Sequence, residues 1–330
     1  MNPIQQFLLI IIILSVVAVV YAYFFRKDLI HKRWFMDKFL LERGLEKPTL
    51  WLFYPSSEVN ARSWLDFGQR SSRALQIPFL NMCYRNIVEQ NKNLYHVRVI
   101  GGLSGLADLL GEDSLPSLLR QHGELASIGP AEMNWIRSAV LAKFGGLWVN
   151  PASVHLKGFG EQPKDKVVFF GTDPTQTYSG KNGTLVPSDH ALWVPRAGHP
   201  MMVEWEQVCF ERIHQKRGGE QIRGDWAWDV MRFTQQYSEK GEGIIMDPHA
   251  ELSRKHDGKR IQLEDLLATG TEGALPFDVP PHVIYVPFPW EELQRREIFG
   301  WFLRMSESQI AESDIAVKYL FQVCMSSPIH

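Results

Sequence analysis

The chain has 330 residues, 45% of them hydrophobic, and a formal net charge of −2 at pH 7. This composition supports a substantial buried core, and the length suits one large α/β domain better than two. The near-neutral charge excludes a general electrostatic attraction to nucleic acid. Three widely separated cysteines, Cys83, Cys209 and Cys324, indicate neither a disulfide framework nor a zinc motif.

The chain begins with an uncharged apolar stretch, FLLIIIILSVVAVVYAYFF, over residues 7–25. A helix of this length crosses the hydrocarbon core of a bilayer. The first six residues carry no side-chain charge, whereas a cleaved signal peptide has a basic start and a shorter apolar core. We therefore predict that residues 1–25 form a retained single-pass transmembrane anchor.

Basic residues follow this stretch directly and set its predicted orientation. The cluster comprises Arg26, Lys27, Lys32 and Arg33. The positive-inside rule places these residues, and with them the globular part, in the cytosol. A single glycosylation sequon at Asn182 favours the lumen instead, but one sequon in a chain of this length readily arises by chance. We predict a basic connector over residues 26–48 and one α/β domain over residues 49–330.

The predicted domain opens with a strand and an arginine-rich segment. Thr49–Tyr54 is a near-continuous apolar run closed by Pro55, which is typical of a buried strand in a parallel sheet. Residues 60–73 are polar. The arginines at 62, 70 and 73 are consistent with two alternatives, binding of a diphosphate or a solvated surface with ion pairs.

A helix over 78–90, a strand over 95–100 and a helix near 106–110 are predicted next. The glycines from Gly101 to Gly105 follow the second strand without the G-x-G-x-x-G spacing, so they indicate an ordinary strand–helix turn. The sequence G-x-x-x-x-G-K-[ST] of a P-loop is also missing. The sequence therefore does not favour a dinucleotide or P-loop site.

The most informative segment runs from Trp135 to Asn150. Its apolar residues recur at helical spacing up to Phe144, and the Gly145-Gly146 pair ends the helix. The apolar residues 147–149 then form a short buried strand.

This segment resembles the signature of the sugar-nucleotide glycosyltransferases related to capsular polysaccharide synthesis and to the DXD sugar-binding group. In that family an Arg-containing helix runs into Tyr/Phe-Gly-Gly, an aromatic residue and a metal-holding Asp-x-Asp. The resemblance implies an A-type glycosyltransferase (Rossmann-like) α/β fold, a nucleotide sugar donor and a glycan acceptor. The matching residues are Arg137, Phe144, Gly145, Gly146 and Trp148.

The Asp-x-Asp position of the family reads Asn150-Pro151-Ala152 in this chain. Transfer from a nucleoside diphosphate sugar releases a diphosphate, whose charge a carboxylate-held divalent ion neutralises in metal-dependent enzymes. Asn150 supplies only a neutral oxygen, so we predict no tight divalent-metal site here and assign no cofactor. Asp247 and His249 are the candidates if metal ligands have moved to the C-terminal part.

Further along, strands are predicted over 166–171, 191–195, 243–246 and 282–286, and helices over 201–215 and 225–237. Ligands of open α/β sheets bind beyond the carboxyl ends of strands, which directs Tyr54, Ile100 and Asn150 toward one crevice. Arg137, on the predicted helix, is a residue type that binds phosphate. The Gly145-Gly146 pair permits the backbone to approach a ligand or a neighbouring strand closely. The predicted substrate-binding residues are Arg137, Gly145, Gly146, Asn150 and Asp189.

Two function classes follow from these patterns. One is a membrane-anchored glycosyltransferase with a metal-independent or rearranged site, whose partners are the membrane, a nucleotide sugar and a glycan acceptor. The other is a catalytically inactive descendant of that fold that serves as a structural or assembly protein, for example in a large DNA virus particle. The sequence contains no Gly-x-Ser-x-Gly elbow, which disfavours a hydrolase. The Asp-x-Asp position is the feature that separates the two classes.

Overall fold

The computed structural model describes residues 47–55, 78–122, 128–172, 186–215, 226–270 and 275–326. All of these residues belong to the compact unit Lys47–His330. The predicted anchor, nearly all of the predicted connector, the arginines at 62, 70 and 73 and the sequon at Asn182 lie outside the described residues and stay predictions. Within the described ranges, no helix combines the length and apolar character needed to cross a bilayer.

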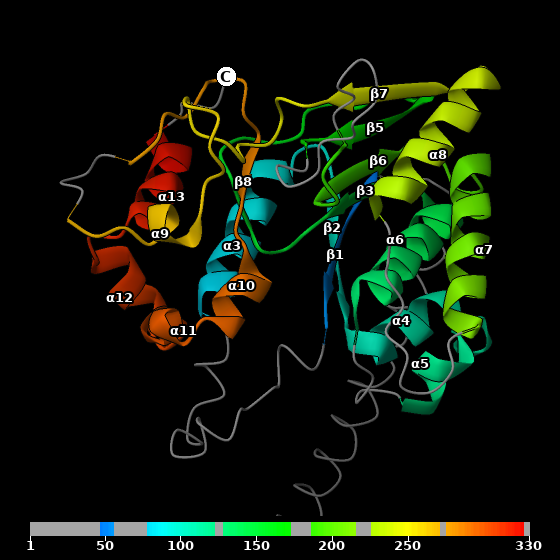
Figure 1. Ribbon diagram of the computed structural model, residues 1–330, viewed down its shortest axis with the longest axis horizontal. Coiled ribbons are helices and arrows are strands. Elements are labelled where there is room, and N and C mark those ends of the chain that lie inside the picture. Colours follow the sequence, from blue (N-terminus) through cyan, green and yellow to red (C-terminus); the bar gives the residue numbers. More distant parts are fainter. Residues whose placement is uncertain are drawn as a thin grey trace, which may run out of the picture. The chain divides into compact units, whose positions relative to one another are not determined.

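A six-stranded sheet forms the centre of the domain, in the order β2-β1-β3-β6-β5-β7 (Figure 1). Strand β6 is antiparallel to both of its neighbours, and every other neighbouring pair is parallel. The predicted α/β class with a mainly parallel sheet is therefore confirmed. In spatial order the strands are β2 (His96–Gly101), β1 (Thr49–Tyr54), β3 (Gly146–Val149), β6 (Ala191–Val194), β5 (Lys166–Phe170) and β7 (Gly243–Asp247).

The reversed direction of β6 decides which residues share an edge of the sheet. Residues that precede β6 lie beside residues that follow β3, because the two strands run in opposite directions. The backbone N–H of Asn150, after β3, donates to the carbonyl oxygen of His190, before β6, at 2.7 Å. This edge therefore gathers the segments that follow β1, β3, β5 and β7 and the segment that precedes β6.

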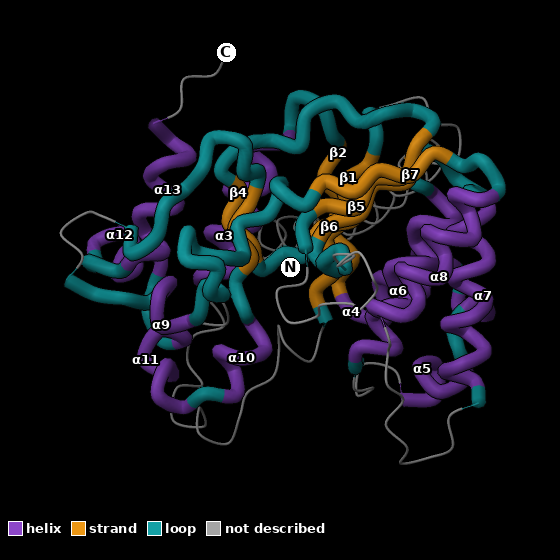
Figure 2. The backbone as a smooth tube through the Cα atoms, turned by 45° about the horizontal axis from the view of Figure 1, so that its top comes forward, coloured by secondary structure: helices purple, strands orange, loops and turns teal. Residues whose placement is uncertain are grey.

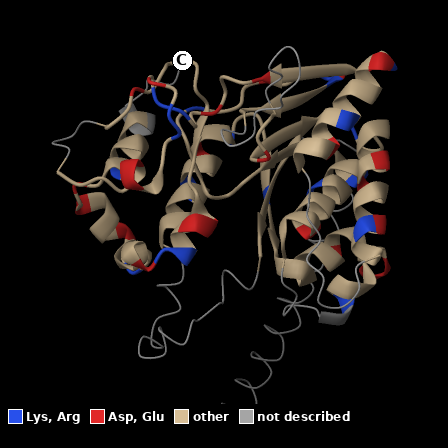
Figure 3. Cartoon of the chain, viewed as in Figure 1, with Lys and Arg blue, Asp and Glu red and all other residues tan. Residues whose placement is uncertain are grey.

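The apolar strands are buried on both faces, as is usual in a largely parallel sheet. Leu50 and Leu52 of β1 pack in one hydrophobic cluster with Ile87. Trp51, on the opposite face of β1, contacts the ring of Phe144 at 5.4 Å between centroids. Strands β1, β3 and β6 carry no charged residue (Figure 3). Continuous apolar runs thus explain the central position of these three strands.

Helices cover both faces of the sheet. One face carries α4 to α8, and the other carries α3 together with the C-terminal helices (Figures 1 and 2). Their bounds are α3 (Pro78–Asn91), α4 (Gly102–Leu110), α5 (Ser117–His122), α6 (Pro130–Phe144), α7 (Pro200–His214) and α8 (Trp226–Glu239). Helix α6 ends before Gly145 as predicted, and it begins at Pro130, five residues before the predicted segment. Pro130 occupies the first turn, the Glu132 carboxylate accepts from the Gly129 backbone N–H at 3.0 Å, and Gly145 ends the helix at φ +66°.

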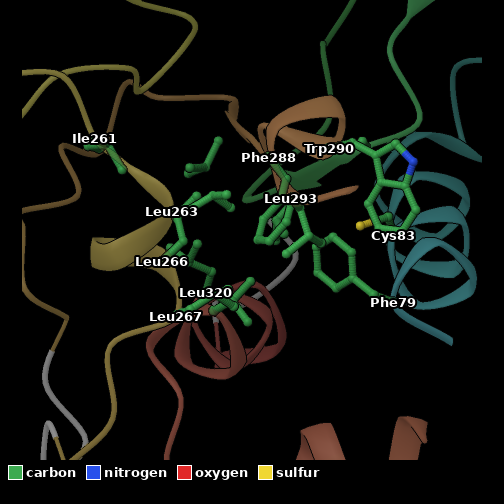
Figure 4. Packing of buried hydrophobic residues seen from close by; sticks show 14 of the residues in the cluster. Phe79, Cys83, Ile261, Leu263, Leu266, Leu267, Phe288, Trp290, Leu293 and Leu320 are labelled. Atoms are coloured by element: carbon green, nitrogen blue, oxygen red, sulfur yellow. The ribbon is translucent and has the colours of Figure 1, made fainter. Parts of the chain in front are cut away.

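The C-terminal part folds back onto α3 and builds a second core. A small antiparallel sheet pairs β4 (Ser153–His155) with β8 (Tyr285–Pro287). Phe79 and Cys83 of α3 pack in this core with Phe288, Leu293 and Leu320 (Figure 4). The helices here are α9 (Leu263–Leu266), α10 (Trp290–Arg295), α11 (Gly300–Leu303), α12 (Glu307–Glu312) and α13 (Ala316–Ser326). Short 3₁₀ turns cover Glu112–Ser114 and Glu297–Phe299.

Two predicted bounds are wrong. The strand predicted over 282–286 is β8, which begins only at Tyr285, because the Val283 N–H closes a turn onto the Pro280 carbonyl at 3.1 Å. The helix predicted near 106–110 begins at Gly102, directly after β2. Gly102 has φ +65°, a conformation that glycine adopts readily and that permits this abrupt change from strand to helix.

Candidate functional site

The strand order reverses between β1 and β3. The chain passes from β1 through α3 to β2 on one side, and returns through α4 to α6 to β3 on the other side of β1. Such a switch point opens a crevice beyond the carboxyl ends of the two strands. A cleft of about 610 Å³ lies there, lined by Tyr54 at the end of β1, by Pro55 directly after it and by Asn150 after β3. Its volume is within the usual range for small-molecule sites.

Arg137 of α6 lines this cleft with a buried side chain. Its Nη2 donates to Asp189 Oδ2 at 3.0 Å, and its Nη1 donates to Asn134 Oδ1 at 3.2 Å. The guanidinium carbon lies 4.5 Å from the ring centroid of Trp226 and 5.9 Å from that of Trp148. The structure thus brings together two predicted site residues, Arg137 and Asp189, and holds the arginine in one orientation through ion-pair, amide and aromatic contacts.

Burial and the neighbouring opposite charge act against each other at both members of this pair. Burial opposes the ionisation of Asp189, but the charges of Arg137 and His190 outweigh it and lower the pKa of the Asp189 carboxyl. Burial lowers the pKa of Arg137, and Asp189 counteracts that effect. The Asp189 side chain remains 46% exposed, whereas that of Arg137 is 4% exposed. The carboxylate is therefore exposed to the cleft, whereas the guanidinium that donates to it is buried.

Asn150 closes a turn rather than presenting a free oxygen. Its Oδ1 accepts from the backbone N–H of Ala152 at 3.0 Å, and the hydroxyl of Ser153 donates to its carbonyl at 2.8 Å. This Asx-type turn links β3 to β4. Asn150, Pro151 and Ala152 offer no carboxylate, and the one amide oxygen is already engaged. These residues do not fit a divalent ion, which requires charged oxygen ligands.

The paired glycines lie at the other end of β3 and do not line the cleft. Gly146 has φ +95°, and a Cβ there would lie 2.4 Å from the carbonyl oxygen of Thr49. A Cβ on Gly145 would lie 2.7 Å from the backbone of Arg196. The close approach that the glycines permit is therefore to neighbouring backbone. Ile100 of β2 does not line the cleft either.

A second group of polar residues adjoins the cleft, and the sequence did not predict it. The buried carboxylate of Glu251 accepts from the hydroxyls of Ser188 and Tyr285, the latter at 2.9 Å. His190 Nδ1 lies 3.1 Å from Glu251 Oε2. A smaller cavity of about 180 Å³ is lined by Ser188, His190 and Glu251, and it shares Asp189, His190, Arg260 and Pro289 with the larger cleft.

His190 is charged at neutral pH in this environment. Burial by itself would lower its pKa, but the Glu251 carboxylate, through its charge and its hydrogen bond, raises the pKa to about 9. Sequence analysis assigned His190 no special role because no metal or catalytic motif surrounds it. Its only local signal is a polar Ser188-Asp189-His190 segment directly before a buried strand.

Buried polar atoms without partners come from three elements that line the larger cleft. They are Tyr54 Oη at the end of β1, Arg137 Nε on α6 and Trp290 Nε1 on α10, and none has a hydrogen-bond partner among the described residues. Buried polar groups are nearly always hydrogen-bonded in native proteins. Three residues around one cleft thus carry a buried polar atom that the described residues leave without a hydrogen bond.

The candidate metal ligand Asp247 ends β7 and His249 lies two residues further on, and neither lines the cleft. Asp247 Oδ1 accepts from the His249 backbone N–H at 3.2 Å, and the His249 ring contacts that of His282. In the part of the chain that the structure describes, no three His, Cys, Asp or Glu residues lie close enough together to hold a metal ion.

No family model matches the chain, and neither does any curated protein. The chain is similar to a solved structure named "PaToxG Glycosyltransferase", with a TM-score of 0.31 and 14% sequence identity, over 67% of this chain and 80% of that chain.

Proposed function

We propose that this chain is a membrane-anchored, glycosyltransferase-like protein that binds a nucleotide sugar in the cleft beyond β1 and β3. The observation that carries the proposal is the set of buried, unpartnered polar atoms of Tyr54, Arg137 and Trp290 around one cleft of ligand size. A nucleotide sugar offers many hydroxyl and phosphate oxygens that suit such groups. The position at the switch point of the sheet supports the same assignment.

Within this proposal the donor binds without a metal at Asn150. The oxygen of that side chain closes its own turn, and no carboxylate stands in the sequence Asn150-Pro151-Ala152. We expect nucleotide binding to persist in EDTA. We also expect Asn150→Ala to leave any Mn²⁺ response unchanged, because the residue is not a metal ligand. Tight, nucleotide-coupled Mn²⁺ binding that disappears in Asn150→Ala would contradict this part of the proposal.

The test is calorimetric titration of the full-length chain in detergent with a panel of nucleoside diphosphate sugars, in EDTA and in Mn²⁺. Tyr54→Phe removes a hydroxyl that has no partner among the described residues, so it should weaken ligand binding about threefold to tenfold without loss of stability. Tyr84→Phe, at an exposed tyrosine of α3 outside the cleft, is the matched control. Failure of every donor to bind would overturn the proposal.

A second candidate function is a non-catalytic structural or assembly role for the same fold. The observation that favours it is the turn at Asn150, which occupies the position where the resembling family holds its metal. The two candidates differ in turnover. Release of free nucleotide from the donor that binds best, with or without added glycan acceptors, would support the transferase. Binding with no turnover of any donor would support the non-catalytic role.

A further inference from the structure

Each charged side chain that lines the larger cleft has an ion-pair partner among the described residues, except for one arginine. Arg260 lines both the cleft and the adjoining cavity, and its side chain is exposed. It has no hydrogen bond or ion pair with any of the described residues. The pairs of the cleft are Arg137 with Asp189, Arg295 with Glu291 and Arg296 with Glu292. Arg260 is thus the arginine of the cleft whose charge no described carboxylate neutralises.

His190 supplies a second donor at the same place. Its Nδ1 faces Glu251 and Ser188, whereas its Nε2 has no partner among the described residues. The side chain is 25% exposed and, like Arg260, lines both cavities. Its backbone carbonyl accepts from the Asn150 N–H at 2.7 Å. The residue that carries this free ring nitrogen is therefore paired through its backbone with Asn150, at the position where the resembling family holds its metal, and both residues line the larger cleft.

We infer that Arg260 and His190 together bind the diphosphate of a nucleotide where the two cavities meet, next to Asn150. The inference rests on the proposed function and specifies how the site neutralises phosphate. A guanidinium donates two parallel bonds to phosphate oxygens, and a second cationic donor nearby adds another. Two side-chain cations then carry out the charge neutralisation that a carboxylate-held metal performs in metal-dependent enzymes.

The charge of His190 depends on the groups packed around it. Glu251 faces it from the segment after β7, Asp189 from its own segment and Arg137 from α6. The hydroxyl of Tyr285 of β8 donates to the same Glu251 oxygen that His190 contacts. Burial disfavours the charged form, and the carboxylates outweigh burial to raise the pKa of His190 to about 9. Diphosphate affinity should therefore be full at neutral pH and fall as the pH rises through about 9.

The test uses the full-length chain in EDTA. It is titrated with inorganic pyrophosphate and with the nucleoside diphosphate of the donor sugar that binds best. The free nucleoside of that donor is titrated alongside. Arg260→Gln and His190→Gln should each weaken both phosphate probes about tenfold and leave the nucleoside unchanged. Lys259→Gln removes an adjacent exposed charge that lines neither cavity and should change nothing. The fall in affinity near pH 9 should disappear in His190→Gln.

The outcomes separate this inference from the proposed function. Nucleotide binding that is equally strong in Arg260→Gln and Lys259→Gln would overturn the inference and leave the proposed function standing. Diphosphate binding that requires Mn²⁺ would overturn it in the same way. If wild-type protein binds no nucleotide under any condition, the proposed function fails. Because Arg260 is exposed, Arg260→Gln should keep the fold even if His190→Gln loses it, so the inference can be tested on that variant alone.

Discussion

Replacing Arg137 by lysine is a sharp test of how the cleft is held together. The substitution keeps the positive charge near Asp189 but removes the planar fork. The arginine now bonds to Asp189 at 3.0 Å and to Asn134 at 3.2 Å, and it lies 4.5 Å from the centroid of the Trp226 ring. A lysine ammonium reaches at most part of this set, because it is a compact point charge on a flexible stem.

The magnitude follows from the contacts that are lost. A hydrogen bond to a charged group contributes about 1.5–3 kcal/mol, and a desolvated cation–π contact contributes about 2 kcal/mol. Because the Arg137 side chain is only 4% exposed, solvent cannot replace these contacts. Allowing for the part that lysine retains, we expect Arg137→Lys to lower the free energy of unfolding by about 3 kcal/mol. For a domain of this size, that corresponds to a melting temperature lower by roughly 5 °C.

The assay is urea unfolding of the full-length chain followed by tryptophan fluorescence, together with calorimetric nucleotide binding. Arg120→Lys is the control, since its 3.5 Å contact with the exposed Asp113 is a surface pair that contributes little. We expect the loss of stability to dominate in Arg137→Lys. A variant with wild-type stability but weakened nucleotide binding would refute this reasoning and would make Arg137 a direct phosphate ligand.

Three further predictions concern the scaffold around the site. Gly146→Ala should destabilise the fold by about 3 kcal/mol, because its Cβ would lie 2.4 Å from a backbone oxygen. Gly160 is also at positive φ, but its Cβ would meet no atom within 4 Å, so Gly160→Ala should cost only about 1 kcal/mol. Equal losses of stability for the two variants in thermal unfolding would contradict this prediction. Asp229→Asn should lower the free energy of unfolding by about 3 kcal/mol in urea, since the fully buried carboxylate accepts two hydrogen bonds from Arg212 at 2.7 and 2.8 Å. A loss below about 1 kcal/mol would show that the pair behaves like an exposed ion pair. His155 is buried, and burial lowers its pKa to about 3. Since the unfolded state binds the proton more readily, the free energy of unfolding should fall as the pH drops from about 6.5 towards 3, and the fall should be smaller in His155→Gln; an identical pH profile for the two proteins would refute that assignment.

Local sequence signals determined most of the secondary structure. The apolar run of β1, the helical periodicity of α6 and the stop at Gly145 involve residues that are neighbours in the chain. Such signals depend on backbone conformation and on burial of a stripe or a run, so they can be recognised without knowledge of the partner. The same is true of Asn150, whose amide in place of a carboxylate is visible in the sequence and determines what this position can bind.

The tertiary structure alone decided which of these residues meet. Strand β6 is as apolar as a parallel strand, and nothing in its composition reveals that it runs in the opposite direction. That direction brings Asp189 to Arg137, 52 residues away in the chain, and His190 to Asn150. Glu251 reaches His190 from 61 residues further along.

The position of the Gly145-Gly146 pair relative to the cleft also depends on the tertiary structure. The pair was identified correctly as a helix stop, yet the direction of β3 places it at the edge of the sheet away from the cleft. Strand direction and strand order depend on long-range pairing and on how α3 and α6 cover opposite faces of the sheet. The spacing of residues along the chain predicts neither strand direction nor strand order. The position of the cleft therefore follows only from the tertiary structure.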